Sequence, residues 1–222
     1  MTTPQPWSHS ALNAFTTCPR QFAETKVLKH FKQSTNAQAQ WGDEAHKAFE
    51  KHLKGEAPLE PRFTSYAPYL QTFLDMPGTL LSEQMYALNK RLMPTDFYAE
   101  DVWCRGIIDV LVLNGFQATV RDHKTGKRKK DMQQLVIFAL LVFYHHPEVQ
   151  VVDTGFEWLQ TKEVDRETFQ RAQIPELWET LVPKLERYAD AFHYGVFPPK
   201  SSGLCKAHCP VDTCEYWGKG RR

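Results

Sequence analysis

No segment of the sequence is apolar for long enough to cross a membrane. The longest hydrophobic run, Leu135 to Tyr144, is well short of the roughly 20 residues that a bilayer requires, and His145 and His146 follow it. The first ten residues show no basic stretch followed by an apolar core, so no secretory signal is visible. We therefore expect a protein of the reducing cytoplasm with no membrane partner, whose five cysteines are thiols or metal ligands rather than disulfides.

An excess of charge of one sign is also missing. The 222 residues include 27 Lys+Arg and 26 Asp+Glu, for a formal net charge of +1. A protein that coats nucleic acid without specificity is strongly basic, so any contact with DNA must come from a local patch. No GxxxxGK[S/T] loop is present, which argues against a built-in ATP motor. With 42% hydrophobic and 24% charged residues the composition is that of a globular protein, and intrinsic disorder is excluded.

The length predicts one compact domain, or one domain with a small appended module. We expect a single domain over residues 1–222, built from an N-terminal helical part (1–60), a catalytic sheet core (80–160) and a C-terminal helix with a cysteine-rich tail (165–222). Helical periodicity predicts helices over three segments: Asn36 to Leu53, Asp131 (as N-cap) to Tyr144, and Ile174 to about Gly195, the last bent or split at Pro183.

Runs of β-branched and aromatic residues predict four strands: Leu80 to Leu88, Cys104 to Leu113, Phe116 to Asp122 and Val151 to Gln160. Helices and strands therefore mix along the chain. The predicted class is α/β in the mixed α+β sense, with a central mixed sheet of about four to five strands flanked by helices.

The dipeptide Asn114-Gly115 between two alternating runs predicts a hairpin with a two-residue type I′ turn. Leu113 would then face Phe116. In that register Asp109 and Asp122 are diagonal neighbours, about 7–8 Å apart at the backbone, and Lys124 projects from the same, otherwise apolar, face.

A single aspartate in a strand is usually a solvated edge residue, but three charged groups converging on an apolar face need another explanation. Two carboxylates alone in such a place repel each other, whereas a hard divalent cation with oxygen ligands cancels the repulsion. An ammonium at Lys124 would orient a water molecule and stabilise the negative charge that develops on phosphorus. The arrangement suits phosphodiester hydrolysis.

These residues resemble a known family. Gly106-Ile107-Ile108-Asp109 and Arg121-Asp122-His123-Lys124-Thr125-Gly126 are similar to the core motifs of the PD-(D/E)XK nuclease superfamily, most closely its RecB-like domains. Further motifs follow the family's order: Trp7 to Leu12 with Cys18-Pro19-Arg20, Gly42 to His46, Glu83, and Gln134 to Ala139, with Phe138 where tyrosine is usual. The resemblance runs from Trp7 to Trp217 and implies a restriction-endonuclease-like core.

The resemblance also implies roles for individual residues. His46, Asp109 and Asp122 would bind Mg²⁺ or Mn²⁺, with the carbonyl of His123 as a further ligand. Lys124 would position and polarise the attacking water. In addition, Gln134 would hold Lys124 or the scissile phosphate, and Glu83 would act in the outer shell of the metal or near the DNA.

The cysteines are unevenly placed, with Cys18 early and Cys205, Cys209 and Cys214 close together near the end. This set resembles the four-cysteine [4Fe–4S] staple of a subset of RecB-like nucleases, although the late spacings of three and four residues differ from the more usual two and five. Zn²⁺ with His208 as a substitute ligand, and free structural thiols, are the alternatives. Cys104, at a strand start, is expected to be a small buried residue.

A basic loop follows the proposed metal site. Lys127, Arg128, Lys129 and Lys130 come directly after Lys124, and we expect them to bind the DNA backbone, with Arg20, Lys26 and the tail from Lys219 extending the track. No base-reading module is visible, so the expected partner is a DNA single strand or duplex end bound without sequence preference.

The function expected from these features is that of a metal-dependent DNA nuclease, an exonuclease that processes DNA ends in recombination or repair. Its gene could belong to a phage, and a recombination or single-strand-binding protein is a further expected partner. The alternative is a DNA-end-binding or partner-docking subunit with a nuclease fold and a structural metal cluster; a zinc-stapled interaction module is a weaker third. A subunit that no longer cleaves should have lost Asp109, Asp122 or Lys124, and all three are present.

Overall fold

The computed structural model describes residues 5–33, 37–128 and 131–219. The chain divides into two compact units: a sheet unit, residues 36–177, and a terminal unit, residues 1–35 with 178–222. The single domain expected from the length stays a prediction. Among the described residues, no helix combines the length and the apolarity that a membrane crossing requires.

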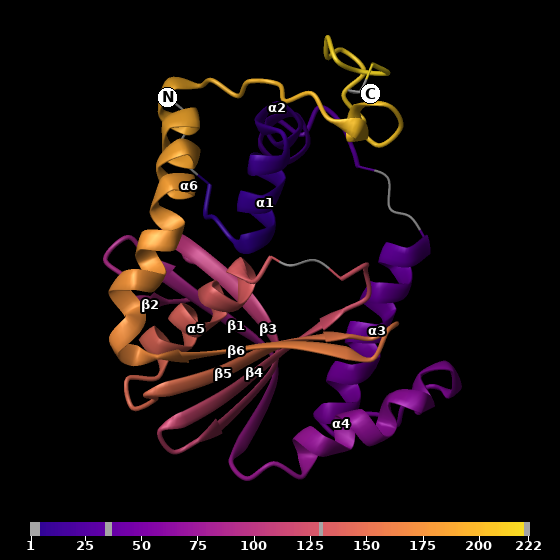
Figure 1. The fold of residues 1–222 in the computed structure, drawn as a ribbon, viewed down its shortest axis with the longest axis vertical. Helices are drawn as coiled ribbons and strands as arrows, with labels where there is room; N and C mark the ends of the chain where they lie inside the picture. The colour runs from indigo at the N-terminus through magenta and orange to yellow at the C-terminus, as the bar shows by residue number, and fades with distance from the viewer. Residues whose placement is uncertain (1–4, 34–36, 129–130, 220–222) are drawn as a thin grey trace. The chain divides into compact units, whose positions relative to one another are not determined.

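The sheet unit contains a mixed sheet that has six strands within the described residues, in the order β2-β1-β3-β4-β5-β6 (Figure 1). The strands are β1 (Thr79–Asn89), β2 (Pro94–Thr95), β3 (Val102–Asn114), β4 (Gln117–Lys124), β5 (Val151–Trp158) and β6 (Glu163–Gln170). All four predicted strands are confirmed, and β4 and β5 form the parallel pair. β2 and β6 were not predicted. β6 is a mostly exposed edge strand that is rich in charged residues, and its sequence therefore does not resemble that of a typical strand. Charged residues at a sheet edge protect it from aggregation.

The hairpin between β3 and β4 differs from the expected one. Asn114 pairs with Gln117 and Leu113 with Ala118, so the two-residue loop is Gly115-Phe116. Gly115 has a φ of 57°, whereas Asn114 and Phe116 do not have positive φ. Glycine at the first loop position is the preference of a type II′ turn, so the predicted Asn-Gly type I′ turn is wrong. The pairing shifts by two residues, and each side chain therefore keeps its predicted face.

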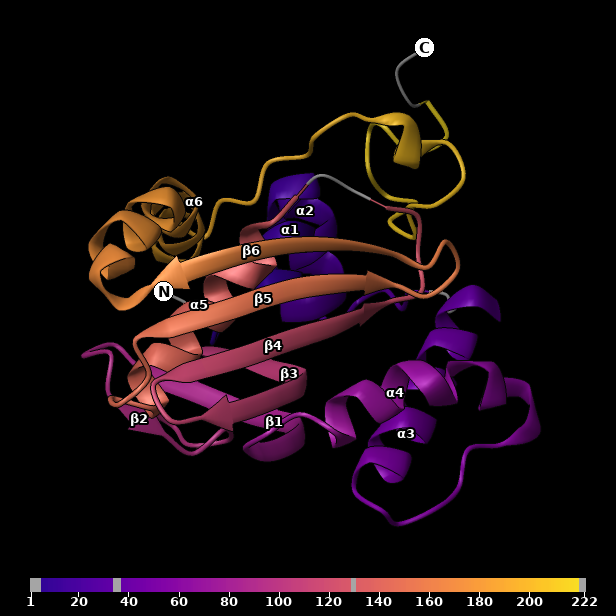
Figure 2. The same ribbon diagram turned by 60° about the horizontal axis from the view of Figure 1, so that its bottom comes forward.

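Helices cover both faces of the sheet. α5 (Gln133–His145) is buried nearly all round and contacts β1, β3, β4 and β5. α3 (Ala37–Leu53), the short helix η2 (Pro61–Tyr66) and α4 (Ala67–Leu74) lie on the other side, where their apolar residues share a core with Val110 and Val112 of β3. Figure 2 shows α5 behind the strands and α3 and α4 at the lower right, away from α5. The α/β class with a flanked mixed sheet is confirmed.

Helix α5 begins close to its predicted start. Its first helical residue is Gln133, and the Asp131 side chain accepts a hydrogen bond from the Gln133 amide at 3.0 Å. The helix ends at His145, next to the predicted end at Tyr144. The carboxylate therefore caps the helix from one position earlier than an ordinary N-cap.

The terminal unit has its own aromatic core. It contains α1 (His9–Thr17), α2 (Pro19–Phe22), a π-helical turn (Ala23–Val27) and most of α6 (Ile174–Tyr194). The rings of Phe15, Phe22 and Tyr188 pack together with centroid distances of 5.3–5.9 Å. Pro183 lies inside α6, which is one helix, so the predicted split does not occur.

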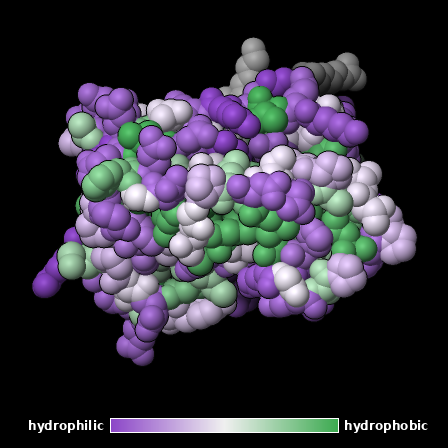
Figure 3. Space-filling view, turned by 90° about the horizontal axis from the view of Figure 1, so that it is seen from below, coloured by the Kyte–Doolittle hydropathy of each residue, from purple (hydrophilic) through white to green (hydrophobic). Residues whose placement is uncertain are grey.

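Apolar side chains also reach the surface. Figure 3 shows patches of them among mostly polar residues. Phe116 at the hairpin turn, for example, is 70% exposed. A single exposed apolar residue such as Phe116 is normal in folded proteins and does not by itself indicate a partner.

Candidate active site

The two aspartates of the hairpin are brought together at its open end. Continuing the register from Val110 and Arg121 by one residue sets Asp109 of β3 directly opposite Asp122 of β4, rather than diagonal to it. Their side chains are almost fully buried, with residue exposures of 7% and 4%. Asp109 Oδ2 accepts a hydrogen bond of 2.7 Å from the backbone amide of His123. Two carboxylates therefore share one buried place.

Lys124, the last residue of β4, joins this cluster. Its Nζ lies 2.5 Å from Asp122 Oδ2 and donates to Gln134 Oε1 at 2.7 Å. Gln134 Nε2 in turn donates to Asp122 Oδ1 at 2.8 Å. Because Gln134 lies in the first turn of α5, the helix holds the lysine and the carboxylate in one closed set of contacts.

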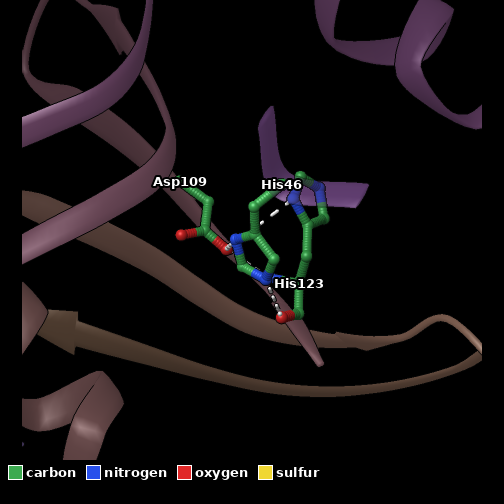
Figure 4. Close-up of side chains that lie close together, drawn as sticks. All are labelled: His46, Asp109 and His123. Atoms are coloured by element: carbon green, nitrogen blue, oxygen red, sulfur yellow. Dashed lines mark hydrogen bonds and ion pairs between the residues drawn. The ribbon is translucent and has the colours of Figure 1, made fainter. Parts of the chain in front are cut away.

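His46 approaches the aspartates from α3. Its Nε2 donates to the carbonyl of His123 at 3.0 Å, and its Nδ1 lies 3.3 Å from Asp109 Oδ2 and 3.8 Å from Glu83 Oε1. Figure 4 shows the imidazole between the Asp109 carboxylate and His123. Two of the predicted metal ligands, the His46 imidazole and the His123 carbonyl, are thus in direct contact.

A glycine lets α3 come this close. Gly42 lies one helical turn before His46, and a Cβ at that position would lie 2.7 Å from Thr125 Oγ1. Gln38 Nε2 of the same helix donates to the carbonyl of Thr125 at 3.1 Å. Thr125 directly follows Lys124 in the chain, so α3 is held against the end of β4, and this contact positions His46.

Glu83 is held in an unusual backbone conformation. Its φ is 51°, in the left-handed region that a residue other than glycine seldom adopts. The β1–β3 pairing runs through Ser82 and Gln84 and omits Glu83, which lies opposite Asp109. Strained residues of this kind cluster at functional sites. The sequence predicted an acidic residue here but not this conformation.

Burial and charge set the protonation of the cluster. Burial, and next the charge of Asp109, raise the pKa of Asp122 to about 6. Burial also opposes ionisation of Asp109, but contacts with His46 and His123 hold its pKa below the usual range. Burial disfavours a charged His46, yet hydrogen bonds to Asp109 and Glu83 outweigh it and raise its pKa to about 10. An imidazolium therefore balances the carboxylates near neutral pH.

These donors fit a divalent cation. Within the described residues, the single group of three His, Cys, Asp or Glu side chains with ligand atoms all within 4.8 Å of one another is His46, Asp109 and His123. Carboxylate oxygens and a neutral imidazole are ligands of such cations, and a cation would relieve the repulsion that raises the pKa of Asp122. A proton on His46 now balances that charge.

The ring of His123 lies between this group, where its Nδ1 is 3.6 Å from Asp109 Oδ2, and a set of aromatic side chains. Its centroid lies 5.1 Å from that of Phe49 and 5.6 Å from that of Tyr69. Burial lowers the pKa of this imidazole to about 4, so the ring is neutral. Phe49 and Tyr69 were not expected near the site. Phe49 belongs to the apolar stripe of the predicted helix, but Tyr69 lies in a segment where no helix was predicted.

The face of β4 that carries Arg121 is covered as well. Arg121 is 2% exposed; its guanidinium lies 2.5 Å from Asp153 Oδ2 and 3.4 Å from Glu157 Oε1. Gly155 of β5 makes room for it, since a Cβ there would lie 3.2 Å from the Arg121 side chain. The sequence predicted an apolar face on the other side of this hairpin, and the structure shows that the Arg121 face is buried as well.

The basic residues that were expected to contact DNA differ in their exposure and in their ion pairs. Lys127 is exposed, whereas Arg128 lies 2.6 Å from Glu163 Oε1 and also pairs with Asp165. Lys129 and Lys130 lie outside the described residues. Arg20 belongs to the terminal unit, where it lies 3.8 Å from Glu24.

The cysteines are all free. Cys18, Cys205, Cys209 and Cys214 line one small pocket in the terminal unit, and Cys104 is buried in β3 as expected. No three of their sulfur atoms, all within the described ranges, lie within 4.8 Å of one another. Burial, and more weakly the other three cysteines, raise the pKa of the Cys209 thiol. The four thiols share a pocket without forming a closed ligand group.

Known proteins resemble this chain at two levels. The family model described as the PD-(D/E)XK nuclease superfamily matches residues 6–215. Among solved structures, a protein of Eubacterium rectale provisionally named an exonuclease is similar, with a TM-score of 0.52, 10% identity, and coverage of 99% of this chain and 89% of that chain. This likeness shows a shared fold. Among curated proteins, none matches the sequence.

Two further structures are more distant. SSO0001 has a TM-score of 0.49 and 14% identity, covering 98% of this chain and 89% of its own. LHK-Exo, solved in complex with dAMP, has a TM-score of 0.37 and 12% identity, and the match covers 85% of this chain and 90% of that chain.

Proposed function

The chain belongs to the PD-(D/E)XK nuclease superfamily, and on that basis we propose that it is a Mg²⁺- or Mn²⁺-dependent deoxyribonuclease that hydrolyses phosphodiester bonds as an exonuclease at DNA ends. One observation carries the proposal. His46, Asp109, Asp122 and Lys124 come from three separate elements and meet in one buried cluster. Burying charged groups costs free energy, and clusters of buried charged groups are therefore typical of functional sites.

The proposed cation ligands are the carboxylates of Asp109 and Asp122, the His46 imidazole and the His123 carbonyl. A divalent cation there would neutralise the carboxylates and stabilise negative charge on the phosphate during hydrolysis. Glu83, 3.8 Å from the same His46 Nδ1 that faces Asp109, would act in the outer shell of the cation and help to orient the imidazole.

Lys124 would position the attacking water and donate to the phosphate oxygens as their charge grows. Gln134 supports this role because its carbonyl oxygen accepts from Lys124 Nζ and so holds the ammonium in one direction. The Lys124 ammonium also lies 4.9 Å from the centroid of the Phe156 ring, a cation–π contact that helps to hold the side chain in place.

Action on DNA ends in recombination or repair, in a reducing cytoplasm, is the most specific form of the proposal. A docking subunit without activity is less well supported, since the three residues that hydrolysis requires are present and in mutual contact through Asp122 and His123.

The test is cleavage of DNA labelled at one end, single-stranded or duplex, with Mg²⁺ or Mn²⁺. We expect products that shorten from one end with time, no products in EDTA, and none with Lys124→Ala. Cleavage that persists in EDTA, or in Lys124→Ala, would show that the site assignment is wrong.

For the cysteines we propose a [4Fe–4S] cluster bound by Cys18, Cys205, Cys209 and Cys214. The support is that these four line a common pocket while Cys104 lies elsewhere, and that soft thiolates suit iron–sulfur clusters. Zn²⁺ is the alternative, but three thiolates around zinc lie closer together than these do.

Iron, sulfide and zinc analysis of protein purified without oxygen tests this. We expect about four irons per chain and a brown colour with absorption near 400 nm. Zinc without iron would overturn the cluster proposal. If neither metal is found, the four cysteines are structural thiols and the cluster proposal is also wrong.

A further inference from the structure

A second cavity lies in the sheet unit next to the proposed active site. Its volume is about 420 Å³, within the range of small-molecule sites. η2 and α4 form one wall, and the turn between β5 and β6 forms the other. The residues that decide its chemistry are three aromatics, a carboxylate and a lysine: Tyr66, Tyr69, Trp158, Glu157 and Lys162.

The cavity is connected to the catalytic strand through β5. β4 and β5 pair in parallel, with His123 beside Glu157 and Lys124 beside Trp158. Neighbouring strands are about 4.8 Å apart, so Trp158 lies one strand away from Lys124 on the same face, whereas Glu157 lies beside His123 on the opposite face. The Tyr69 ring also packs at 5.6 Å from the ring of His123.

The wall offers polar groups that no protein group fully uses. The Tyr69 hydroxyl is buried and has no hydrogen-bond partner among the described residues. The Tyr66 hydroxyl, by contrast, donates to the Leu159 carbonyl at 3.3 Å. Glu157 is 8% exposed, and its contact with Arg121, at 3.4 Å from Nε, is not a hydrogen bond. Buried polar atoms normally have partners, so a ligand that supplies them would gain binding free energy.

The charges around the cavity are nearly balanced. Glu163 pairs with Arg128 at 2.6 Å, and Glu157 faces Arg121. Lys162, in the part of the chain that the structure describes, makes no ion pair. The carboxylates would repel a phosphate inside the cavity, whereas a neutral planar ring would not be repelled. Lys162 suits a phosphate at the rim.

We propose that this cavity binds one nucleobase of the DNA strand that is cut at the neighbouring site. The base would stack on the aromatic walls and donate N–H groups to Glu157, with its backbone phosphate near Lys162. The inference rests on the nuclease function proposed above. A base enters only when it is unpaired and unstacked, so the substrate class is a single strand or a frayed duplex end.

Binding without metal tests the cavity alone. In EDTA, the full-length protein is titrated with dGMP and, as the base-free control, with 2-deoxyribose 5-phosphate, followed by calorimetry. We expect dGMP to bind about 10-fold more tightly than the sugar phosphate, as for base stacking on aromatics. Glu157→Gln and Tyr69→Leu should each weaken dGMP about 10-fold. Tyr98→Leu, the same change at a tyrosine that is 80% exposed and outside the cavity, should not.

Equal affinity for both compounds, or unchanged dGMP affinity in Glu157→Gln, would overturn the proposal. Glu157→Gln keeps the shape of the side chain, so the test does not depend on whether Tyr69→Leu folds.

Cleavage then connects the cavity with the active site. In a series of end-labelled single strands, one abasic nucleotide is moved along the sequence. We expect the wild type to cut one particular bond near the abasic site about 10-fold more slowly, and Glu157→Gln to cut normal and abasic strands at the same reduced rate. If the wild type cuts every abasic strand at the rate of the normal strand, the base subsite is wrong, while the nuclease proposal is unaffected. If dGMP binds as expected and no DNA is cut, the nuclease proposal fails and the base site stands.

Discussion

The carboxylate–lysine cluster of the sheet unit and the cysteine pocket of the terminal unit are both expected to bind metal, but they are built differently. The first is made by side chains on β3, β4, α3 and the first turn of α5, and its groups already contact one another at 2.5–3.3 Å. The second is made by cysteines in short turns and at a helix start, and no three of its sulfurs, all described, come within 4.8 Å.

Regular backbone hydrogen bonds explain the contrast. A strand or helix sets the direction of each side chain before any ligand arrives, whereas an irregular segment leaves its ligands to be ordered by the metal, whose binding then contributes to folding. We therefore expect the first region to control activity and the second to control stability. The following experiments test that division.

Lys124→Ala should have the largest effect. Loss of a group that stabilises charge at the reacting phosphate lowers rates by about 10²–10³-fold, and loss of water positioning adds to this. The free energy of unfolding should change little, because the lysine is partly exposed and terminates its strand. Single-turnover cleavage and thermal unfolding, measured on the same preparation, give both numbers. A large fall in Tm with modest loss of rate would contradict a preformed catalytic region.

Gly42→Ala should come next. The added methyl would lie 2.7 Å from Thr125 Oγ1 and push α3 away from the catalytic strand. A displacement of about 1 Å at a catalytic group costs up to about 100-fold in rate, so we expect a loss of 10- to 100-fold. Ala45→Gly, another small change in the same helix, is the control for general helix weakening. Equal losses of rate and stability in both variants would show that the close approach at Gly42 has no special role.

The affinity for Mg²⁺ should depend on pH through His46. Its pKa is raised from 6.5 to about 10, so the proton stabilises the metal-free protein fully below pH 6.5 and this stabilisation is lost as pH rises through 10. A cation must displace that proton. The Kd for Mg²⁺ should therefore fall about 10-fold per pH unit between 6.5 and 10.

Calorimetric titrations from pH 6.5 to 9 measure this slope. His46→Ala should bind Mg²⁺ more weakly and with a much flatter pH dependence. A flat dependence in the wild type would mean that His46 does not compete with the cation.

Cys205→Ala should affect stability rather than catalysis. If the cluster orders the pocket, its loss lowers Tm by about 5 °C or more and removes the iron, while cleavage of a short oligonucleotide below the new Tm stays within about twofold. Cys104→Ala is the matched control, because Cys104 is buried but does not line the pocket, and this variant should keep its iron. Loss of cleavage with an intact fold would remove the proposed division between the two regions.

Arg128→Ala should have the smallest effect. Its guanidinium already pairs with Glu163 and Asp165, so it contributes less to DNA binding than the exposed Lys127. We expect less than a twofold rise in KM for Arg128→Ala and a larger rise for Lys127→Ala at low salt. The reverse order would show that Arg128 leaves its carboxylates to contact DNA.

Much of the fold and of the catalytic strand follows from local pattern. Alternation at Asp109, Asp122 and Lys124 places them on one face whatever the exact turn, because a shift of two residues preserves the face. For this reason the incorrect type I′ turn did not move the aspartates away from each other. Edge strand β6 escaped prediction since its charged residues lack that alternation.

Contacts between segments that are distant in the sequence could not be predicted from local pattern. His46 and His123 are 77 residues apart, and their contact depends on Gly42 allowing α3 onto the strand end. The covered face of Arg121, the left-handed backbone of Glu83 and the pairing of Arg128 with β6 have the same origin. Side-chain period and turn preference are properties of neighbouring residues, whereas helix-to-sheet packing depends on the shapes of surfaces that the chain brings together only on folding. The residues that we propose for the chemistry can therefore be found in the sequence, whereas the residues that contact them are set by packing.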